Sequence, residues 1–341
     1  MNSRRLGPVI GLVATIVVAV VAVVAAGCAP GPSPSAAAVP LKVGLGYIPS
    51  VQFAQFYLAD QAGYYADEGL DVTFQNDIDA NLVPKVGQGN LDIGMSDGTS
   101  VIPAVSQEIP IRYIATVYGR FPSIVFGKAS SGIKAAADLE GKKIGIPARS
   151  GSSWIMLQAL LASADLTSND VEIVEYPDFG QGVAVAQGVV DAATGFANNE
   201  PVVLARSGTE VFVLHIDDIT ALPGPGLIAS TATIAAKRDA VTGFVRATLR
   251  AMKDIVTEPA KGLDATIHAV PELGQDRGLQ AAILAATIES WQRPGSSGAE
   301  GLGAIDRAGW EASVKFMTEL KLVAKPVTID DLVVEDFVTT P

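Results

Sequence analysis

The sequence has few of the side chains on which metal sites and most enzyme active sites depend. Its 341 residues include one cysteine, Cys28, and two histidines, His215 and His268. A single cysteine excludes an internal disulfide, and the chain has neither a CxxC motif nor a histidine pair at metal-ligand spacing. It also lacks a Walker loop and a GxGxxG turn, the usual phosphate-binding motifs. We therefore predict that the protein binds no metal and uses no cofactor.

Positive charge is also scarce, with 24 Lys and Arg against 36 Asp and Glu and a net charge of −12. Nucleic-acid binding requires a basic surface, so this composition argues against a DNA or RNA partner. After residue 28 no apolar run reaches the roughly 20 residues that a membrane-spanning helix needs. The main body of the chain is therefore predicted to be a soluble, acidic domain.

The one long apolar run lies at the N-terminus. Two arginines precede the stretch VIGLVATIVVAVVAVVAAG, which ends in small residues before Cys28. This pattern is typical of a secretory signal peptide, predicted over residues 1–27. AAGC resembles a bacterial lipobox, although Ala25 stands where leucine is usual. We predict lipidation of Cys28, a flexible tether over residues 28–40 and a lipid-anchored, extracytoplasmic location. An uncleaved anchor and a plainly secreted chain are the alternatives.

An internal repeat indicates the architecture. VGQGNLDIGMSDG (86–98) and VAQGVVDAATGFA (185–197) share the pattern V-x-Q-G-x-x-D-x-[GA]. Around each copy, segments with strand and helix periodicity alternate in the order strand, helix, strand, helix, strand, helix, strand. Such alternation implies crossover connections and mostly parallel sheets. We therefore predict an α/β fold with two similar lobes.

The lobes are predicted to differ in how the chain forms them. Lobe 1 would comprise residues 41–126 and 223–341, because the C-terminal helices are expected to pack back on it. Lobe 2 would comprise residues 127–222. A cleft between two α/β lobes is a favoured ligand site, and hinge closure around the ligand is the expected motion.

Ligands of open α/β sheets bind beyond the carboxyl ends of the strands, so the strand-end loops predict the site. These loops are residues 47–51, 75–79, 96–100, 118–122, 147–153, 177–179, 196–201 and 222–226. From these loops and the helix starts after them we select as candidate ligand-binding residues Tyr47, Gln52, Ser96, Asp97, Tyr118, Ser150, Gly151, Ser152, Trp154, Asn198, Asn199 and Glu200.

The candidates have different chemistry. Tyr47 and Trp154 could stack on a ring, although Trp154 could equally cover the core of its lobe. Residues 150–152 begin a predicted helix, whose free N–H groups suit an oxygen-bearing ligand, unless a serine simply caps the helix. The run NNE (198–200) supplies two amides and a carboxylate, more than one helix cap requires. At least one of these three residues is therefore predicted to bind ligand.

The stretch GMSDG matches the G-x-S-x-G pattern of a hydrolase nucleophile elbow, with Ser96 as the nucleophile. A hydrolase also needs an acid and a histidine, and the chain offers only His215 and His268. The matching segment of the repeat, ATGFANN, has no serine in the corresponding place. The repeat therefore explains the motif better than catalysis does.

Four segments carry a resemblance to a known family: GYIPSVQFAQFYLADQAGYYADEGLDV, GQGNLDIGMSDG, DLEGKKIGIP and GVVDAATGFANNEPV. They resemble the substrate-binding components of ABC importers in the superfamily of thiamine-pyrimidine synthase-like and aliphatic sulfonate-, taurine- and nitrate-binding proteins. The resemblance covers residues 41–255 well and the C-terminal helices loosely. It implies a type II-like periplasmic-binding-protein fold, with a permease and a cytoplasmic ATPase as partners.

The resemblance also bears on enzyme activity and on the ligand. The synthase of this group depends on a cysteine-rich motif and a histidine, whereas this chain has no cysteine after Cys28 and no histidine within residues 41–126, so we predict no enzyme. Asp97 and Glu200 occupy equivalent loops and would repel an anion. We therefore predict a heteroaromatic ligand, a thiamine pyrimidine precursor or riboflavin. If Asp97 only caps a helix and points away, a small anion such as a sulfonate, taurine or nitrate becomes the alternative, and a lipid-anchored sensor or adhesion module is a third class.

Overall fold

The computed structural model describes residues 1, 37–77, 79–219, 222–293 and 298–338. The predicted signal peptide, Cys28 and most of the predicted tether lie outside these residues. The first strand, β1, begins at Val39, two residues before the predicted start of the folded body. Within the described residues, no helix is long and apolar enough to cross a membrane. The same residues contain no cluster of three or more His, Cys, Asp or Glu side chains that could hold a metal ion.

Ten strands form two five-stranded sheets in the described part of the chain. The first sheet has the order β2-β1-β3-β10-β4, and β10 alone runs against the other four strands. The second has the order β7-β6-β8-β5-β9, and β5 alone runs against the rest. The strands are β1 (Val39–Leu45), β2 (Leu70–Asn76), β3 (Ile93–Ser96), β4 (Ile111–Thr116), β5 (Ser123–Lys128), β6 (Lys143–Ile146), β7 (Glu172–Glu175), β8 (Ala192–Phe196), β9 (Val211–His215) and β10 (Gly226–Ser230).

The antiparallel strands are the two places where the chain passes from one sheet to the other. After β4 the chain enters the second sheet through β5, and after β9 it returns to the first sheet through β10. The predicted boundary between residues 126 and 127 lies inside β5, which pairs with β8 and β9. The second sheet therefore starts at Ser123. The predicted boundary at 126/127 has no turn signal, because SIVFGK continues through it as one strand, whereas Gly119 and Pro122 precede the true start of that strand.

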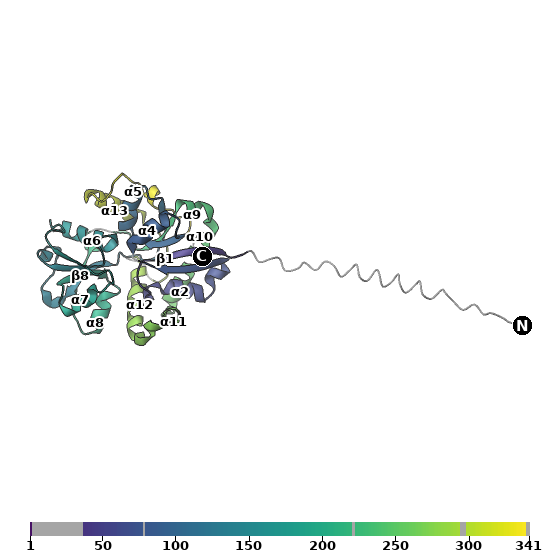
Figure 1. Ribbon diagram of the computed structural model, residues 1–341, viewed down its shortest axis with the longest axis horizontal. Helices are drawn as coiled ribbons and strands as arrows, with labels where there is room; N and C mark the ends of the chain where they lie inside the picture. The colour runs from purple at the N-terminus through teal and green to yellow at the C-terminus, as the bar shows by residue number, and fades with distance from the viewer. Residues whose placement is uncertain (2–36, 78, 220–221, 294–297, 339–341) are drawn as a thin grey trace. The chain divides into compact units, whose positions relative to one another are not determined.

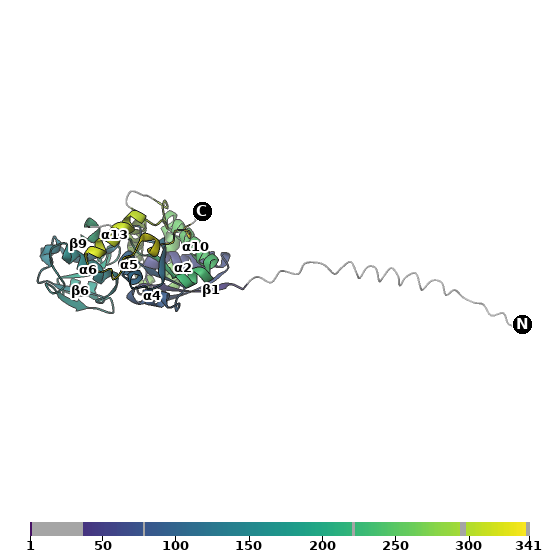
Figure 2. The same cartoon turned by 90° about the horizontal axis from the view of Figure 1, so that it is seen from above.

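Helices cover both faces of each sheet, as Figures 1 and 2 show. In Figure 1, α4, α5 and α13 lie above β1, whereas α2, α11 and α12 lie below it; α6 lies above β8, and α7 and α8 lie below it. The helices are α2 (Ala54–Gln61), α3 (Tyr64–Asp67), α4 (Asp79–Gly87), α5 (Gly98–Ser106), α6 (Gly151–Ala162), α7 (Gln181–Gln187), α8 (Glu200–Arg206), α9 (Thr231–Ala236), α10 (Arg238–Thr257), α11 (Pro259–Ala269), α12 (Arg277–Trp291), α13 (Arg307–Glu319) and α14 (Ile329–Leu332).

The C-terminal helices complete the core around the first sheet. Phe244 of α10 and Trp291 of α12 belong to the same buried cluster as Val43 of β1 and Phe56 of α2. On the opposite face, Trp310 of α13 packs edge-on against Tyr113 of β4, with ring centroids 4.9 Å apart. Apolar burial of this kind is the main stabilising term for a fold. The chain segment after residue 222 therefore contributes to the same hydrophobic core as the first strands.

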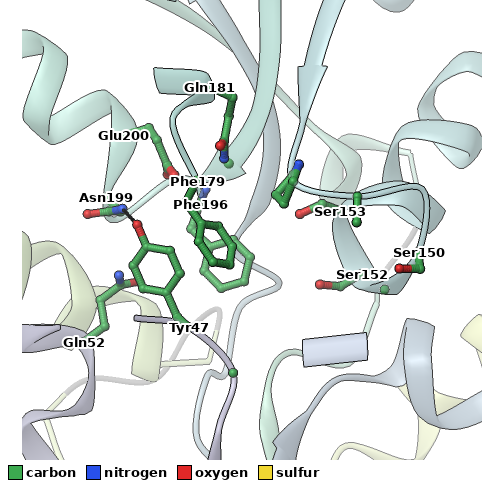
Figure 3. A pocket seen from close by; sticks show the side chains of 15 residues that line it. Tyr47, Gln52, Ser150, Ser152, Ser153, Phe179, Gln181, Phe196, Asn199 and Glu200 are labelled. Atoms are coloured by element: carbon green, nitrogen blue, oxygen red, sulfur yellow. Dashed lines mark hydrogen bonds between the residues drawn. The ribbon is translucent and has the colours of Figure 1, made fainter. Parts of the chain in front are cut away.

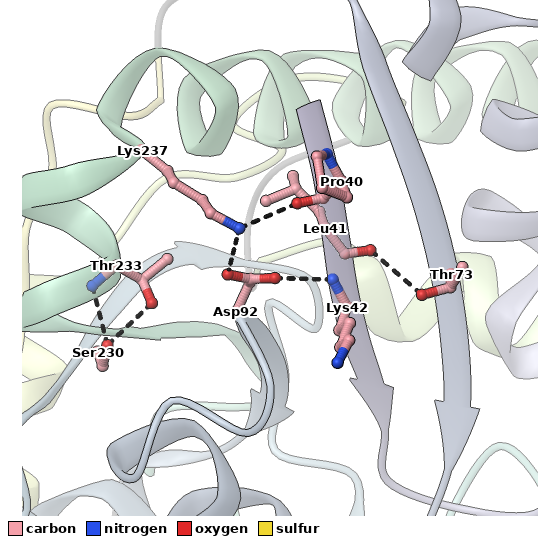
Figure 4. A network of polar contacts seen from close by, with 8 residues as sticks. All are labelled: Pro40, Leu41, Lys42, Thr73, Asp92, Ser230, Thr233 and Lys237. Atoms are coloured by element: carbon pink, nitrogen blue, oxygen red, sulfur yellow. Dashed lines mark hydrogen bonds and ion pairs between the residues drawn. The ribbon is translucent and has the colours of Figure 1, made fainter. Parts of the chain in front are cut away.

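The repeated aspartate has the same structural role in both copies. Asp92 and Asp191 each follow a left-handed glycine by three residues and accept the backbone N–H of a residue in a neighbouring strand. The acceptor distances are 2.9 Å to Lys42 N and 2.9 Å to Lys143 N. Asp92 has a second partner, Lys237 Nζ, at 2.8 Å (Figure 4). The repeated aspartate is therefore a structural tie between strands, and neither copy of it lines the candidate ligand site.

Because Asp92 has the additional lysine partner, Asp92→Ala should destabilise the protein more than Asp191→Ala. We expect Asp92→Ala to lower the free energy of unfolding by about 2 kcal/mol and Asp191→Ala by about 1 kcal/mol, since only the first leaves a half-buried lysine without its carboxylate. Urea denaturation of the two variants measures the difference. Equal losses would mean that Lys237 contributes nothing through Asp92.

Candidate functional site

Two small pockets share a wall at the carboxyl ends of the strands. We call the first, of about 80 Å³, the inner pocket, and the second, of about 50 Å³, the side pocket. The inner pocket is lined by Gly46, Tyr47, Gln52, Pro147, Ala148, Ser150, Gly151, Ser152, Ser153, Phe179, Gln181, Gly195, Phe196, Asn199 and Glu200 (Figure 3). The side pocket is lined by Gly46, Gln52, Phe53, Met95, Ser96, Asp97, Tyr118, Ser152, Phe196 and Pro225. Because four residues line both, the pockets are adjacent, and we treat them together as the candidate site.

Ten of the twelve candidate residues line this site. Seven line the inner pocket: Tyr47, Gln52, Ser150, Gly151, Ser152, Asn199 and Glu200. Ser96, Asp97 and Tyr118 line the side pocket. The remaining two, Trp154 and Asn198, do not line either pocket.

Trp154 packs on the core of its lobe, which was the alternative to a stacking role. Its side chain rests against the buried cluster of the second sheet that includes Ile144 and Leu157, and the Arg149 guanidinium lies 5.7 Å from the ring centroid. One turn into α6, the side chain packs on the core of its lobe and not at the helix N-terminus that faces the pocket. The stacking role predicted for Trp154 is therefore not supported by its position.

Asn198 is buried behind the pocket and joins the two lobes. It is 1% exposed, and its amide Nδ2 donates to Gln52 Oε1 at 3.0 Å and to Thr287 Oγ1 at 2.8 Å. The hydroxyl of Tyr118 lies at 3.5 Å from the same nitrogen. Asn198 thus comes from the loop after β8 and contacts residues of η1 (Val51–Phe53) and α12, which belong to the first lobe. It positions Gln52, which does line the pocket.

Glu200 places a desolvated carboxylate at the edge of the inner pocket. Its Oε2 accepts the backbone N–H of Phe196 at 2.8 Å. A Cβ on residue 195 would lie 2.7 Å from this carboxylate, so Gly195 leaves the space that the carboxylate occupies. Burial raises the pKa of Glu200, and hydrogen bonds from Phe196 N–H and the Asn199 side chain offset the rise only in part. A ligand N–H group that donates to this carboxylate would stabilise its buried, charged form.

Asp97 caps a helix and also lines the candidate site, so it has both of the roles that the sequence analysis considered. Its Oδ1 caps α5 by accepting Thr99 N at 2.9 Å, Thr99 Oγ1 at 2.6 Å and Ser100 N at 3.2 Å. It nevertheless lines the side pocket, and Ser152 of α6 also hydrogen-bonds to it. Burial raises the pKa of Asp97 to about 6 despite these bonds. The capping role therefore does not remove the carboxylate from the site.

The raised pKa of Asp97 predicts a pH-dependent stability. A carboxyl with a folded pKa of about 6 and an ordinary value of 3.8 stabilises the fold below about pH 4, and this contribution is lost as the pH rises through 6. An asparagine in its place would keep the helix cap without the charge. We expect Asp97→Asn to be more stable than the wild type by roughly 3 kcal/mol at pH 7.5 and nearly equally stable at pH 4. Urea unfolding at both pH values measures this; a pH-independent difference between the two proteins would contradict the assignment.

The N-terminus of α6 supplies hydrogen-bond donors on the other side of the inner pocket. Ser150 is the N-cap residue, but its side chain makes no capping hydrogen bond. The first-turn residues, 151–153, line the pocket. The expectation that a serine simply caps this helix is therefore not met by Ser150. Its hydroxyl and the first N–H groups remain able to bind an oxygen atom of a ligand.

Aromatic side chains form the middle of the inner pocket. The Tyr47 and Phe179 rings meet edge to face, with centroids 4.7 Å apart and an interplanar angle of 79°. Phe196 lies beside them (Figure 3). Asn199 Nδ2 lies 3.4 Å from the Tyr47 hydroxyl, and burial together with the charge of Glu200 raises the pKa of Tyr47 to about 12. Tyr47 is thus a neutral ring and hydroxyl at physiological pH.

Phe179 and Gln181 were missed as site residues by sequence reasoning. Phe179 has φ 59°, a left-handed conformation that is uncommon and costly for a bulky side chain. Gln181 is 1% exposed. Its Nε2 donates to Thr194 O at 3.3 Å, whereas its Oε1 has no hydrogen-bond partner within the described part of the chain. The loop 177–179 ends a predicted strand, so its position was a signal, but the left-handed backbone of Phe179 leaves no trace in composition.

The polar groups of the site divide into two kinds. In Figure 3, Gln181, Asn199 and Glu200 lie on one side of the aromatic rings, and Ser150, Ser152 and Ser153 lie on the other. The first side presents the acceptors Gln181 Oε1 and the Glu200 carboxylate, and the second presents the donors of α6. A flat ring with an N–H group at one edge and an oxygen at another would be chemically complementary to this arrangement.

Comparison with known proteins places the chain in a family. Residues 50–262 match the model of the protein family described as NMT1/THI5 like. Over 315 residues, 91% of this chain and 89% of the other, the sequence is 34% identical to the riboflavin-binding protein RibY of Chloroflexus aurantiacus. The chain belongs to the NMT1/THI5-like family. The predicted resemblance is confirmed by these relatives.

The chain is also similar to an enzyme and to a solved binding protein. The chain is 28% identical over 237 residues, 65% of this chain and 68% of the other, to the 4-amino-5-hydroxymethyl-2-methylpyrimidine phosphate synthase of Aspergillus parasiticus. Its fold is similar to that of the alkanesulfonate-binding protein SsuA from Xanthomonas axonopodis pv. citri bound to MOPS, with a TM-score of 0.67, 18% identity and coverage of 88% and 100% of the two chains. The predicted two-lobe periplasmic-binding-protein fold is confirmed.

Proposed function

We propose that this NMT1/THI5-like protein is the substrate-binding component of an ABC importer and that its ligand is riboflavin or a similar heteroaromatic vitamin or precursor. The proposal rests on the inner pocket, where aromatic rings lie beside buried hydrogen-bond acceptors. Tyr47, Phe179 and Phe196 line the space between Glu200 and the α6 N-terminus. The pyrimidinedione ring of a flavin has an N–H flanked by carbonyl oxygens and a flat apolar surface, which matches these three elements. The riboflavin-binding relative supports the same ligand class.

Capture of the ligand would occur by closure and desolvation and not by covalent chemistry. Asn198 and Asn199 of the second lobe already contact Gln52 and Tyr47 of the first, so the lobes meet at the site. A bound ring would bridge the same surfaces and favour the closed state over an open one. The closed form would then be recognised by a membrane permease with a cytoplasmic ATPase, which are the partners implied by the importer role. We propose an extracytoplasmic location for the same reason, with Cys28 as the lipid anchor.

An enzymatic role receives little support from the site residues. Ser96 Oγ is buried and has no hydrogen-bond partner among the residues that the structure describes, so none of these residues is placed to activate it as a nucleophile. His215 belongs to β9 and His268 to the last turn of α11, and neither lines the two pockets. Cys28 is the sole cysteine, so the chain lacks the cysteine-rich motif of the synthases it resembles.

A small anion is the second candidate, because the α6 N-terminus alone would favour it. The carboxylates of Asp97 and Glu200 line the same pockets and would repel a sulfonate or nitrate. The balance of charge therefore favours a neutral ligand with N–H donors.

A melting series separates these ligands. The protein is unfolded and refolded to remove any bound molecule, and its melting temperature is recorded with riboflavin, hydroxymethylpyrimidine, formylaminopyrimidine, thiamine, taurine, an alkanesulfonate and nitrate. A ligand at about one hundred times its dissociation constant adds about 2.7 kcal/mol to the free energy of unfolding. We expect a clear rise with riboflavin and none with taurine, the alkanesulfonate or nitrate. A rise with the anions alone would replace the proposed ligand class, and no rise with any ligand would contradict the importer role.

A further inference from the structure

A third cavity adjoins the inner pocket, and we call it the outer chamber. Its volume is about 430 Å³, against about 80 Å³ for the inner pocket. Tyr47, Phe179, Asn199 and Glu200 line both spaces. The outer chamber therefore lies next to the inner pocket with these residues between them, and a ligand that passed between their side chains would occupy both spaces.

The outer chamber differs from the inner pocket in its chemistry. Its walls are largely aliphatic and include Ile48, Val183, Val203, Leu204, Leu279 and Ile283. Among its described lining residues, Glu200 at the shared edge is the only acid or base other than tyrosine. Ile48, Val183 and Val203 are 48%, 60% and 39% exposed, which is unusual for side chains of this size. Apolar surface left accessible beside a binding site usually contacts a ligand or partner.

The barrier between the two spaces is weakly held. The Tyr47 and Phe179 rings touch edge to face, with centroids 4.7 Å apart, and such a contact contributes about 1 kcal/mol. The Asn199 hydrogen bond to the Tyr47 hydroxyl is long, at 3.4 Å. A planar ring inserted between the two aromatic rings would replace their mutual contact with stacking of similar strength. Separation of the pair by a ligand is therefore inexpensive.

We propose that the inner pocket and the outer chamber form one ligand site for a fused, multi-ring heterocycle. The hydrogen-bonding ring enters the inner pocket beside Glu200, the middle of the ligand separates Tyr47 from Phe179, and an apolar ring extends into the outer chamber. This inference rests on the proposed function and narrows it, because a single pyrimidine ring would reach only the inner pocket. An isoalloxazine, polar at one end and a dimethylbenzene at the other, matches both halves.

Two exposed valines of the same lobe provide a matched test. Val183 lines the outer chamber, whereas Val189, which is 54% exposed, lines neither this chamber nor the two pockets. Val183→Asp and Val189→Asp add the same charge at similarly exposed positions, so both variants should fold, as their melting temperatures without ligand will report. Riboflavin affinity is measured by quenching of flavin fluorescence, and hydroxymethylpyrimidine affinity by calorimetry.

We expect Val183→Asp to weaken riboflavin binding at least tenfold, Val189→Asp to leave it within twofold, and the wild type to bind riboflavin more tightly than hydroxymethylpyrimidine. If the wild type binds riboflavin and both variants bind it equally well, the outer chamber is not part of the site although the proposed function stands. Tighter binding of hydroxymethylpyrimidine than of riboflavin would also overturn the two-part site. If the wild type binds neither compound, the proposed function itself fails.

Discussion

Glu200→Gln is expected to weaken riboflavin binding by about 30-fold while leaving the protein at least as stable as the wild type. Glutamine can still accept the Phe196 N–H through its amide oxygen, but it no longer offers a charged acceptor to the ligand N–H. A hydrogen bond to a charged group contributes about 2 kcal/mol, which corresponds to this loss. The raised pKa of Glu200 shows that the buried carboxylate is itself unfavourable, so its neutralisation does not destabilise the fold. Fluorescence titration and urea denaturation measure the two effects.

Glu140→Gln is the matched control for this variant, because Glu140 is exposed and lies in the same lobe. It changes the net charge by the same amount and should alter neither affinity nor stability. An affinity of Glu200→Gln equal to that of the wild type would show that Glu200 does not face the ligand. Tighter binding of an alkanesulfonate by Glu200→Gln than of riboflavin would favour an anion as the natural ligand.

Phe179→Ala and Phe179→Gly should both lose about 100-fold in riboflavin affinity, because each removes a ring that lines the pocket. Loss of one stacking and burial contact costs about 3 kcal/mol. The two variants should nevertheless differ in stability. At φ 59°, glycine is unstrained and alanine is not, so the glycine variant is expected to be more stable by about 1 kcal/mol.

The pair separates a binding role of the Phe179 ring from a structural role of its backbone. Affinity is measured by titration and the free energy of unfolding by urea for each variant. Wild-type affinity in both variants would remove Phe179 from the site. An alanine variant as stable as the glycine variant would show that the left-handed backbone is not strained.

The alternation of strands and helices, and the repeat, were sufficient to predict an α/β fold with two lobes. The order of strands within each sheet was not predictable, because the insertion of β5 and β10 against the direction of their neighbours depends on how the chain crosses between sheets. SIVFGK and GLIAS have the buried, apolar character of any central strand. Nothing local distinguishes a strand that crosses to the other sheet from one that stays.

Position along the chain predicted most of the site, because strand-end loops of an α/β sheet meet at one edge. Chain position did not predict which of two neighbouring residues lines the pocket, because that depends on the direction in which each side chain points. Asn198 and Asn199 are neighbours, but only Asn199 lines the inner pocket, whereas Asn198 is buried against Gln52 and Thr287. Trp154 lies three residues after Gly151 on the same helix, yet it packs on the core of its lobe.

The residues that the sequence did not reveal share a physical cause. Phe179 reaches the pocket through a left-handed backbone, and Gln181 through a buried amide whose second partner is missing within the described residues. Both are costly arrangements that the fold tolerates at a functional site. Local propensity favours neither, so only three-dimensional structure shows them.

Binding of one flat, neutral heteroaromatic molecule between Glu200 and the α6 N-terminus is tested most directly by isothermal calorimetry of the refolded, ligand-free protein with riboflavin. We expect saturable binding with one riboflavin per chain, and no displacement when taurine or an alkanesulfonate is present in excess. Absence of riboflavin binding, together with saturable binding of an alkanesulfonate, would contradict this expectation.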